Sequence, residues 1–289
     1  MLEVIRLLEL DTSLIKAPER AMNRTELKML DLLKRGRDQY GVVSVKAEFE
    51  AEGTRPDEFL RLLEMTHKAG LKVALKIGGC EAVTDLLNSK LYGVDYIIAP
   101  MVETPYALLK FIEAKDKTHN ADEQSQTTFL FNLETETTLQ SLDAMAAVGK
   151  GKVDGIVFGR VDFTLSRGLP RGDIDTRSIT DAVLKVATVA RDNDMELVVG
   201  GSVSTASIPA LREIHAVRLD RFETRKVIFG GDALVKTDIE AGIENAVEFE
   251  LAWLQNKRDY YTRIASEDSK RMDMIEKRLA AVAKKPKLV

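Results

Sequence analysis

The chain has 289 residues, of which 45% are hydrophobic, and its 42 basic and 46 acidic residues are mixed along the sequence and give a net charge of -4. This length suits one large α/β barrel or two modest domains, and the charge balance leaves no broad basic field that would bind nucleic acid or an anionic membrane. Because Cys80 is the single cysteine and we recognise neither a signal peptide nor an apolar run of roughly 20 residues, we expect no internal disulfide, no membrane span and a cytoplasmic location.

Short β-rich runs alternate with amphipathic helical stretches from Gly41 onward, which is the pattern of a parallel α/β fold. Helices are expected to begin near Pro56, after the turn at Gly78-Gly79 and near Pro105, and another precedes Glu196. The predicted strands, in chain order, are 42–49, 72–77, 96–99, 127–133, 155–158, 196–199 and, more weakly, 217–222.

Seven strands are one fewer than a closed (β/α)8 barrel needs. Residues 1–40 are expected to be a helical lead-in, and we place the missing strand there, at Val4–Leu10, although its spacing also fits a helix. Residues 41–238 would then form the barrel, followed by a helical arm at 239–289.

The arm carries an apolar stripe at Ile243, Val247, Leu251 and Leu254, with Trp253 beside it. A helix of this length would extend about 65 Å, beyond one barrel, unless it breaks near Ser266. We therefore expect a homo-oligomer that associates through these C-terminal helices.

Two predicted strands deliver a carboxylate at the end where parallel barrels place their chemistry, Glu134 after 127–133 and Asp162 after 155–158. Hard oxygen ligands in such positions suit Mg²⁺ or Mn²⁺. The alternative is that Glu134 caps the following helix and Asp162 stabilises a loop. Glu48, at the end of the first strand, could hold metal-bound water, or it could be a solvated neighbour of Glu50.

Cationic and glycine-rich positions at the same strand ends are candidates for anion binding. Lys76 closes its strand on the same face as Ala74, where we expect it to act as a fixed cation and not as a Schiff-base nucleophile. Arg160 offers a second anion-binding group, and Gly200-Gly201 resembles a backbone-lined anion pocket. Gly78, in the turn after Lys76, is grouped with these substrate-binding positions. Each of these residues could instead have an ordinary structural role in a turn or on the surface.

These segments together resemble the superfamily of the HpcH/HpaI aldolases and the citrate lyase β-subunit, as a divergent branch. The resemblance covers roughly 43–232, and the segments that carry it, in order, are the acid-ended strand at Glu48, the cation-ended strand at Lys76, Ala-Pro-Met-Val at Pro100, Leu-Glu-Thr at Glu134, and Val-Asp-Gly-Ile-Val-Phe-Gly-x-x-Asp at Asp162.

The resemblance implies a (β/α)8 barrel, an oligomer built through exchanged C-terminal helices, and a carbon-carbon lyase or aldolase. It implies that Glu134 and Asp162 ligate Mg²⁺ or Mn²⁺ and that Glu48 holds metal-bound water. The substrate would be a pyruvate-like or oxaloacetate-like 2-keto acid whose enolate the metal stabilises as a Lewis acid. The backbone N–H groups near Val161 and Asp162 would receive its carboxylate.

Two departures from the family pattern concern the chemistry. Lys76 stands where the family has arginine, and lysine cannot reproduce a bidentate guanidinium fork. Phe49 stands where the aldolase branch has a histidine base. The replacement acid, base and anion-binding groups that we consider are Glu50, Glu103, Glu223 and Arg225.

Two alternatives therefore stay open beside the lyase. One is enolate chemistry on phosphoenolpyruvate or a phosphonate, with Gly200-Gly201 and Arg160 holding the phosphate. The other is a non-catalytic barrel that binds keto acids, which Phe49 favours and the retained Glu134, Asp162 and Glu48 oppose.

Overall fold

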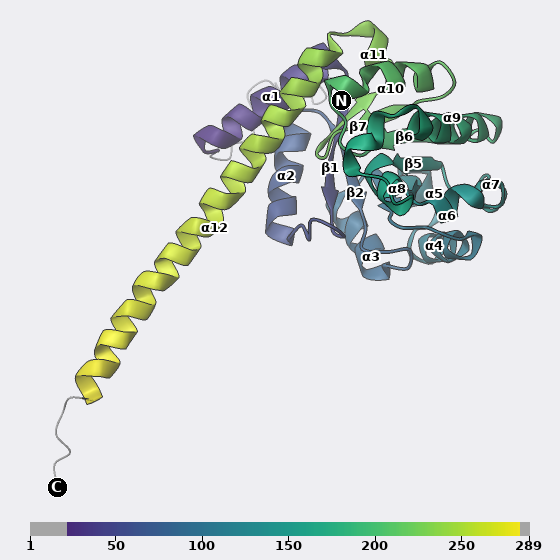
Figure 1. Cartoon of the computed structure of the whole chain (residues 1–289). Coiled ribbons are helices and arrows are strands. Elements are labelled where there is room, and N and C mark those ends of the chain that lie inside the picture. The colour runs from purple at the N-terminus through teal and green to yellow at the C-terminus, as the bar shows by residue number, and fades with distance from the viewer. Residues whose placement is uncertain (1–21, 284–289) are drawn as a thin grey trace, which may run out of the picture.

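The structure, a computed structural model, describes residues 22–283. Eight strands close into a barrel in which each strand neighbours the next in sequence and the last pairs with the first (Figure 1). The strands are β1 Val42–Glu48, β2 Lys72–Lys76, β3 Tyr96–Ala99, β4 Thr128–Leu133, β5 Gly155–Gly159, β6 Glu196–Gly200, β7 Arg221–Glu223 and β8 Val227–Gly230. This is the predicted TIM-barrel fold, with a long C-terminal helix attached.

The eighth strand corrects one prediction. Val4–Leu10 lies outside the described residues, and the barrel is completed instead by β8, which follows β7 after only three residues. A connection of three residues is long enough for a hairpin but too short for a crossover. For this reason β8 runs antiparallel to β7, and it is antiparallel to β1 as well. The other neighbouring pairs are parallel. The β7–β8 turn at 224–226 therefore lies at the same end of the barrel as the C-terminal ends of β1 to β7.

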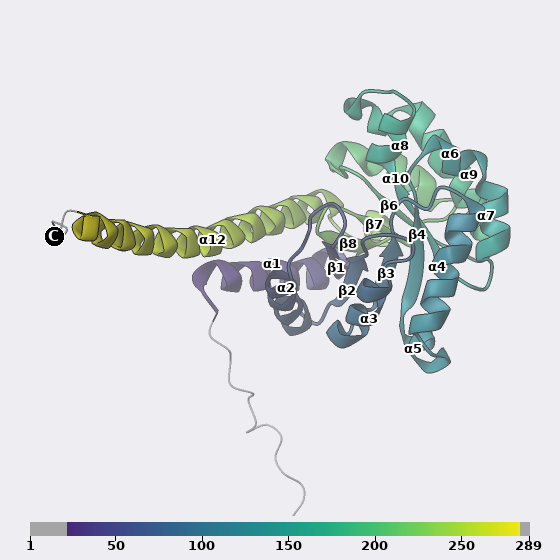
Figure 2. The same cartoon turned by 90° about the horizontal axis from the view of Figure 1, so that it is seen from below.

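Helices surround the barrel on its outer side (Figures 1 and 2). They are α1 Arg24–Tyr40, α2 Pro56–Lys68, α3 Val83–Tyr92, α4 Pro105–Thr118, α5 Ala121–Gln126, α6 Glu136–Gln140, α7 Leu142–Gly149, α8 Arg160–Ser166, α9 Arg177–Asp192, α10 Ile208–His215, α11 Ala233–Lys236 and α12 Ile239–Ala283, with short 3-10 turns η3 Arg171–Asp175 and η4 Thr205–Ser207.

Local sequence sets the ends of α1, the helix that leads into the barrel. Asn23 caps its start, because the side chain accepts a hydrogen bond from Glu26 N at 2.9 Å while the Glu26 carboxylate accepts from Asn23 N. Gly41 ends the helix in the left-handed conformation at φ 72°, which glycine adopts without steric cost. The chain then enters β1 directly.

Two apolar layers stabilise the barrel. The inner layer fills the barrel with side chains that include Ala74, Ile98, Leu130 and Val198. The outer and larger layer lies between strands and helices. Four charged residues on the inward faces of β1, β2 and β7 lie above the inner layer, toward the C-terminal end of the barrel: Lys46, Glu48, Lys76 and Glu223.

Helix α12 packs along α1 and then extends far beyond the barrel (Figures 1 and 2). It runs from Ile239 to Ala283 without interruption, so the arm is one long helix, and the alternative of a break near Ser266 does not occur. Ser269 is accommodated because its Oγ donates to Ala265 O, 2.8 Å away on the preceding turn. None of the helices formed by the described residues is long and apolar enough to cross a membrane.

Candidate functional site at the barrel mouth

The mouth of the barrel gathers charged side chains from several strand ends. Alternation along each strand sends every second side chain inward, which places Lys46 and Glu48 on the inner face of β1 and Asn132 and Glu134 on that of β4. Lys76 ends β2 on the same side. All five residues are almost completely buried. Burial of so many charges is costly unless they are paired or bind a ligand.

Glu134 is held in a fixed orientation. Its Oε1 accepts a hydrogen bond from Met101 N at 2.9 Å, and its Oε2 accepts one from Asn132 Nδ2 at 2.6 Å. Gly159 lies opposite it at the end of β5, where a Cβ atom would come within 2.7 Å of Glu134 Oε2. Glycine at position 159 is therefore needed to leave room for this carboxylate.

The backbone that holds Glu134 is itself strained. Met101, just after β3, adopts φ 48°, in the left-handed region that residues other than glycine rarely occupy. Such a conformation costs on the order of 1–3 kcal/mol and concentrates at functional sites. Here it directs the Met101 N–H at Glu134, so the strain serves to position the carboxylate.

Lys76 lies between two carboxylates at distances longer than a direct hydrogen bond. Its Nζ is 3.6 Å from Glu134 Oε2 and 3.4 Å from Glu50 Oε2. The Glu50 side chain is 28% exposed, whereas that of Glu134 is 3% exposed. Lys76 thus connects a buried carboxylate to one that solvent and a ligand can reach.

The side of the mouth formed by β1, β7 and β8 carries a compact ion cluster around Lys46, next to Lys76 on β2. Lys46 Nζ donates to Glu223 Oε1 and lies 3.2 Å from Glu48 Oε1. Burial opposes the charged form of Lys46, but the two carboxylates outweigh it and raise its pKa above the ordinary lysine value. Burial likewise opposes ionisation of Glu48, yet Lys46, Lys76 and Arg225 hold the pKa of Glu48 below its usual value. Glu223 Oε2 has no hydrogen-bond partner among the described residues.

The β7–β8 turn adds two more cations to this cluster. Lys226 Nζ donates to Glu52 Oε2, and Arg225 Nε donates to Glu52 Oε1 at 3.1 Å. Burial lowers the pKa of Lys226, and the nearby Glu52 carboxylate opposes this shift. The Arg225 side chain is half-exposed, with Nη2 3.9 Å from Glu48 Oε2. These contacts join the turn to the loop that follows β1.

Arg160, which we predicted to bind an anion at the catalytic end of the barrel, binds protein groups instead. Its side chain is buried and uses four of its five N–H groups, bonding Gly200 O at 3.1 Å, Gly201 O at 2.9 Å, Ser207 Oγ at 3.2 Å and Asp175 Oδ1 at 2.6 Å. The guanidinium thereby holds the loop after β6 against α8. A direct substrate contact by Arg160, and the phosphate-holding role of the phosphoenolpyruvate alternative, do not fit this arrangement.

Gly200 and Gly201 permit two close approaches. A Cβ atom on Gly200 would come within 2.8 Å of Glu223 Oε1, and one on Gly201 within 2.7 Å of Val161 N. Gly201 has φ 91°, and the next residue, Ser202, has φ 49°. The glycines therefore bring the end of β6 against the first turn of α8.

The remaining predicted site residues make few side-chain contacts with the rest of the protein. The Gly78 amide donates to Asp85 Oδ2 at 2.7 Å, so it is already bound within the protein. Glu103 and Asp162 are exposed, Val161 is half-buried, and none of their side chains has a hydrogen bond or ion pair among the contacts of the described residues. Asp162 lies in the first turn of α8, directly after β5.

The donor set partly fits a hard divalent cation. No group of three or more His, Cys, Asp or Glu side chains suited to a metal occurs within residues 22–283. Mg²⁺, however, is commonly held by one or two carboxylates, with water and substrate oxygens completing its coordination. Glu134 and Asp162 come from adjacent strand ends, and the buried Asn132 Oδ1 beside Glu134 has no partner in the described chain. These residues therefore suit a two-carboxylate site better than an all-protein cage.

Three residues of the mouth were not singled out from the sequence: Lys46, Asn132 and Lys226. A usable signal existed for the first two, because each is a polar residue two positions before a predicted strand-end acid, on the same inward face. Lys226 lies in a turn whose existence depended on recognising β8.

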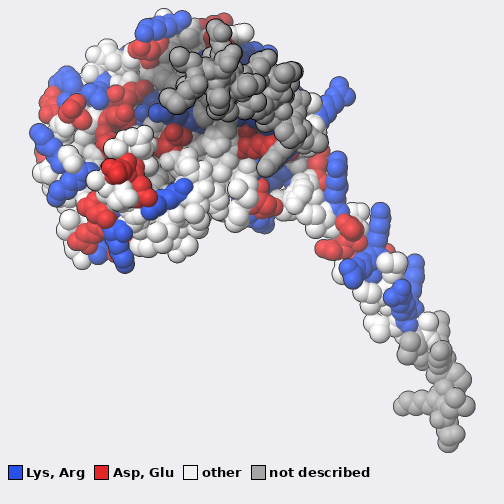
Figure 3. Space-filling view, turned by 180° about the vertical axis from the view of Figure 1, so that it is seen from behind, with Lys and Arg blue, Asp and Glu red and all other residues white. Residues whose placement is uncertain are grey.

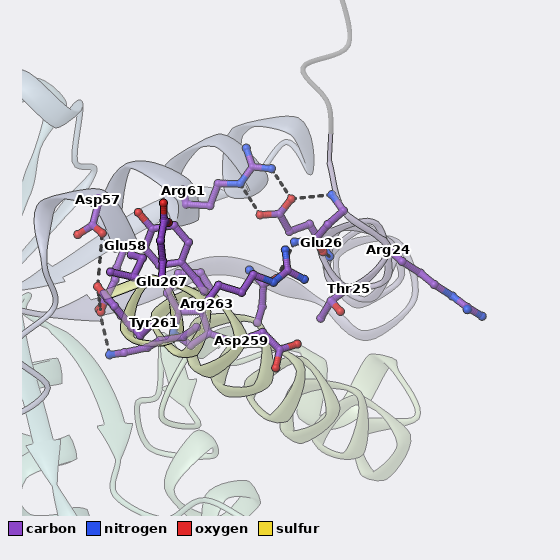
Figure 4. Close-up of a pocket in the computed structure, with 16 residues that line it drawn as sticks. Arg24, Thr25, Glu26, Asp57, Glu58, Arg61, Asp259, Tyr261, Arg263 and Glu267 are labelled. Atoms are coloured by element: carbon purple, nitrogen blue, oxygen red, sulfur yellow. Dashed lines mark hydrogen bonds and ion pairs between the residues drawn. The ribbon is translucent and has the colours of Figure 1, made fainter. Parts of the chain in front are cut away.

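Two cavities lie away from the mouth. The larger, about 640 Å³, is bordered by the start of α1, α2 and the middle of α12 (Figure 4). Its charged groups pair with one another: Arg61 bonds Glu26, and Tyr261 Oη lies 2.8 Å from Glu58 Oε1. The second, about 620 Å³, lies at the N-terminal end of the barrel near Lys152 and Glu196. Neither contains the predicted site residues.

The fold and its mouth define a TIM-barrel protein with buried carboxylates and a cation where such barrels bind small anionic substrates. The family model described as HpcH/HpaI aldolase/citrate lyase matches residues 57–207, which is more than half of the chain. The chain belongs to this family.

Solved structures show the same fold. An HpcH/HpaI aldolase from Desulfitobacterium hafniense is 15% identical with a TM-score of 0.53, over 68% of this chain and 82% of that one. An HpcH/HpaI aldolase/citrate lyase family protein from Burkholderia cenocepacia is 14% identical with a TM-score of 0.52, over 83% and 99%. A variant of the citrate synthase SbnG is 15% identical with a TM-score of 0.51, over 79% and 90%. A search of curated proteins found no match.

Proposed function

We propose that this protein is a carbon-carbon lyase or aldolase that acts on a small 2-keto acid, pyruvate-like or oxaloacetate-like, with Mg²⁺ or Mn²⁺ as cofactor. The observation that carries the proposal is the arrangement of Glu134 and Lys76. A buried carboxylate, held by a strained backbone amide, has a cation 3.6 Å away at the C-terminal end of the barrel. Membership of the aldolase/citrate lyase family supports the same reaction class.

In this proposal Glu134 and Asp162 hold the divalent cation. When bound, the ion would act as a Lewis acid toward the oxygens of the keto acid. Glu134 offers the better-defined ligand, because Met101 N and Asn132 Nδ2 fix its orientation. Asp162, exposed in the first turn of α8, is free to turn toward the ion.

Lys76 is the proposed contact for the substrate anion. A 2-keto acid carries a carboxylate, and electron density moves onto its keto oxygen when the bond between C3 and C4 breaks, because the electron pair of that bond forms the enolate. An ammonium group beside that oxygen stabilises the developing charge. The other mouth cation that is partly accessible is Arg225, which we propose to meet a more distant carboxylate of an oxaloacetate-like substrate.

Glu50 is the residue that we propose for proton transfer in place of the family histidine. Phe49, at the histidine position, has no ionisable group, and its ring packs against that of Phe59 with centroids 5.5 Å apart. Glu50 follows it, with Oε2 3.4 Å from Lys76 Nζ and a partly exposed side chain. Glu223 is less suitable because Lys46 already engages its Oε1. Glu103 is exposed and makes no described ion pair.

The proposal is tested by comparing Glu134→Gln and Asp162→Ala with the unaltered chain. Mn²⁺ binding is measured by electron paramagnetic resonance and Mg²⁺-dependent thermal stabilisation by calorimetry. Release of pyruvate from oxaloacetate and from 4-hydroxy-2-keto acids is measured in parallel. We expect both variants to lose metal binding and pyruvate release together.

Glu113→Gln is the matched control, because this carboxylate lies on α4 away from the mouth and pairs with Lys110 on the surface. It should behave as the unaltered chain. Metal binding that persists in both site variants would place the ion elsewhere. Metal and pyruvate binding without any cleavage would favour the non-catalytic keto-acid-binding barrel.

A further inference from the structure

The distal part of α12 leaves its own barrel without a partner. Its last anchors are Lys257 Nζ to Glu58 Oε2 at 3.0 Å and Tyr261 Oη to Glu58 Oε1 at 2.8 Å, both on α2 (Figure 4). Every side chain from Thr262 to Ala281 is exposed. This stretch alone extends about 30 Å at 1.5 Å per residue. A single helix of this length has little stability in water unless it packs against something.

The predicted apolar stripe of the arm divides into two faces in the structure. Ile243 is buried against the protein, as are Phe249 and Trp253. Val247, Leu251 and Leu254 point away and are more than half-exposed. The first part of α12 thus packs on its own subunit with one face and presents a second apolar face to solvent.

That second face continues as a heptad pattern to the end of the arm. Steps of four and three residues alternate without a break, which is the spacing of a coiled-coil core. We call these positions the heptad seam: Val247, Leu251, Leu254, Arg258, Tyr261, Ala265, Asp268, Met272, Ile275 and Leu279. Tyr261 lies at the edge of this face, because its Oη also bonds Glu58 of its own subunit at 2.8 Å. Only Arg258 and Asp268 are charged. The apolar members of the last part, Met272, Ile275 and Leu279, are 46–65% exposed.

We propose that the heptad seam pairs with the seam of a second copy of this chain in an antiparallel two-stranded coiled coil. This pairing joins arm to arm. It differs from the exchange of C-terminal helices onto a neighbouring barrel that the family resemblance implies, and it does not depend on the proposed enzymatic reaction.

Charge decides the antiparallel orientation. Within the seam, residues 247–256 carry two acidic and no basic residues, a net charge of -2, whereas 257–281 carry seven basic and five acidic residues, a net charge of +2. Figure 3 shows both signs of charge along the distal part. An antiparallel pair places the acidic part of each arm against the basic part of the other. A parallel pair would place like against like.

The two charged seam positions lead to the same orientation. In a parallel pair Arg258 would face the partner's Arg258, and Asp268 the partner's Asp268, inside the core. In the antiparallel register centred on Ala265, Arg258 lies one layer from the partner's Asp268. Leu251 then faces the partner's Leu279, and Leu254 faces the partner's Ile275. Each end of the pair becomes apolar, and the opposite charges meet near the middle.

Disulfide formation between two single-cysteine proteins tests the orientation. Both carry Cys80→Ser; one adds Leu251→Cys and the other Leu279→Cys, with a size tag on one. Under mild oxidation of the mixture we expect the mixed disulfide. Disulfides between two Leu251→Cys chains instead would establish a parallel pair and overturn the proposal. Absence of any cross-link would overturn it as well.

Light scattering at micromolar concentration tests whether the seam causes association. Ile275→Glu with Leu279→Glu should at least halve the oligomer mass, while the subunit stays folded because both positions are exposed. Met274→Glu is the matched control, since Met274 is 55% exposed and lies off the seam. A full-length mass equal to the 32.2 kDa chain, or equal losses in both variants, would contradict the proposal.

Discussion

The two sides of the barrel mouth differ in how completely their charged side chains are paired. On the paired side, two lysines and three carboxylates form ion pairs at short range, and one oxygen of Glu223 has no hydrogen-bond partner in the described chain. These residues are Lys46, Lys226, Glu48, Glu52 and Glu223. On the open side, Lys76 is 3.4–3.6 Å from its carboxylates, Asn132 Oδ1 has no partner in the described chain, and Asp162 makes no described ion pair.

This difference distinguishes charges that stabilise the fold from charges that remain available to a ligand. Buried charges that satisfy one another stabilise the closure of the barrel between β1 and β8, and losing one partner leaves another buried and uncompensated. Groups held close but incompletely satisfied retain capacity for a ligand. We therefore expect changes on the paired side to lower stability first, and changes on the open side to lower activity first.

The largest effect is expected from Lys46→Met on the paired side. Removing the cation leaves Glu223 and Glu48 buried together, which should cost about 3–5 kcal/mol in free energy of unfolding. Urea denaturation measures this loss. Lys28→Met, which breaks an exposed pair with Glu248, should cost below about 1 kcal/mol. Equal losses in the two variants would remove the distinction between buried and exposed pairs.

Lys76→Met on the open side should lower kcat/KM for pyruvate release by about 10²–10³. Lys76→Arg keeps a cation and should retain a larger part of the activity, although its geometry differs. Thermal unfolding of both variants separates the catalytic loss from a folding defect. Borohydride reduction with pyruvate should leave no adduct on Lys76, and a covalent adduct would assign it to Schiff-base chemistry instead.

The ionisation of Glu48 should make the stability of the protein depend on pH. Because its folded-state pKa is lowered, its stabilising contribution is fully present above the ordinary glutamate pKa of 4.5 and is lost as the pH falls through the lowered value. Glu48→Gln should therefore be less stable than the unaltered chain by about 1.5–3 kcal/mol at neutral pH. The gap in unfolding free energy should narrow below pH 4.5. A gap independent of pH would mean that the charge of Glu48 is not what matters.

The smallest effect on stability is expected from Arg225→Ala. Its side chain is 51% exposed, so its ion pairs with Glu52 and Glu48 should contribute about 0–1 kcal/mol. If Arg225 meets a second substrate carboxylate, KM for oxaloacetate should rise while KM for a monocarboxylic substrate stays unchanged. A stability loss as large as that of Lys46→Met would move Arg225 to the structural cluster.

The sequence predicted much of the barrel because strand patterns are local. Six strands, from β1 to β6, coincide closely with predicted runs, since alternating or continuous apolar residues of strand length need no knowledge of their neighbours. β7 was recognised only weakly, and β8 was missed, because four residues after a three-residue turn carry almost no periodic signal. The eighth strand was sought at Val4–Leu10 for that reason.

The candidate site shows the same division. Glu48, Lys76 and Glu134 could be placed at the mouth from sequence, because inward alternation and strand ends follow from local spacing. Arg160 looked equally suitable by those rules. Its partners come from the loop after β6 and from Asp175, and only folding brings these groups together.

The sequence by itself determined the alternation of strands and helices, the side chains at the strand ends and the heptad spacing of the arm, because each depends on a repeat of two, 3.6 or 3.5 residues along the chain. The tertiary structure decided which charges are paired, why Gly159 must lack a side chain beside Glu134, and which way β8 runs. Those outcomes depend on contacts between residues far apart in sequence, and the free energy of a buried charge is set by the partner that such a contact supplies.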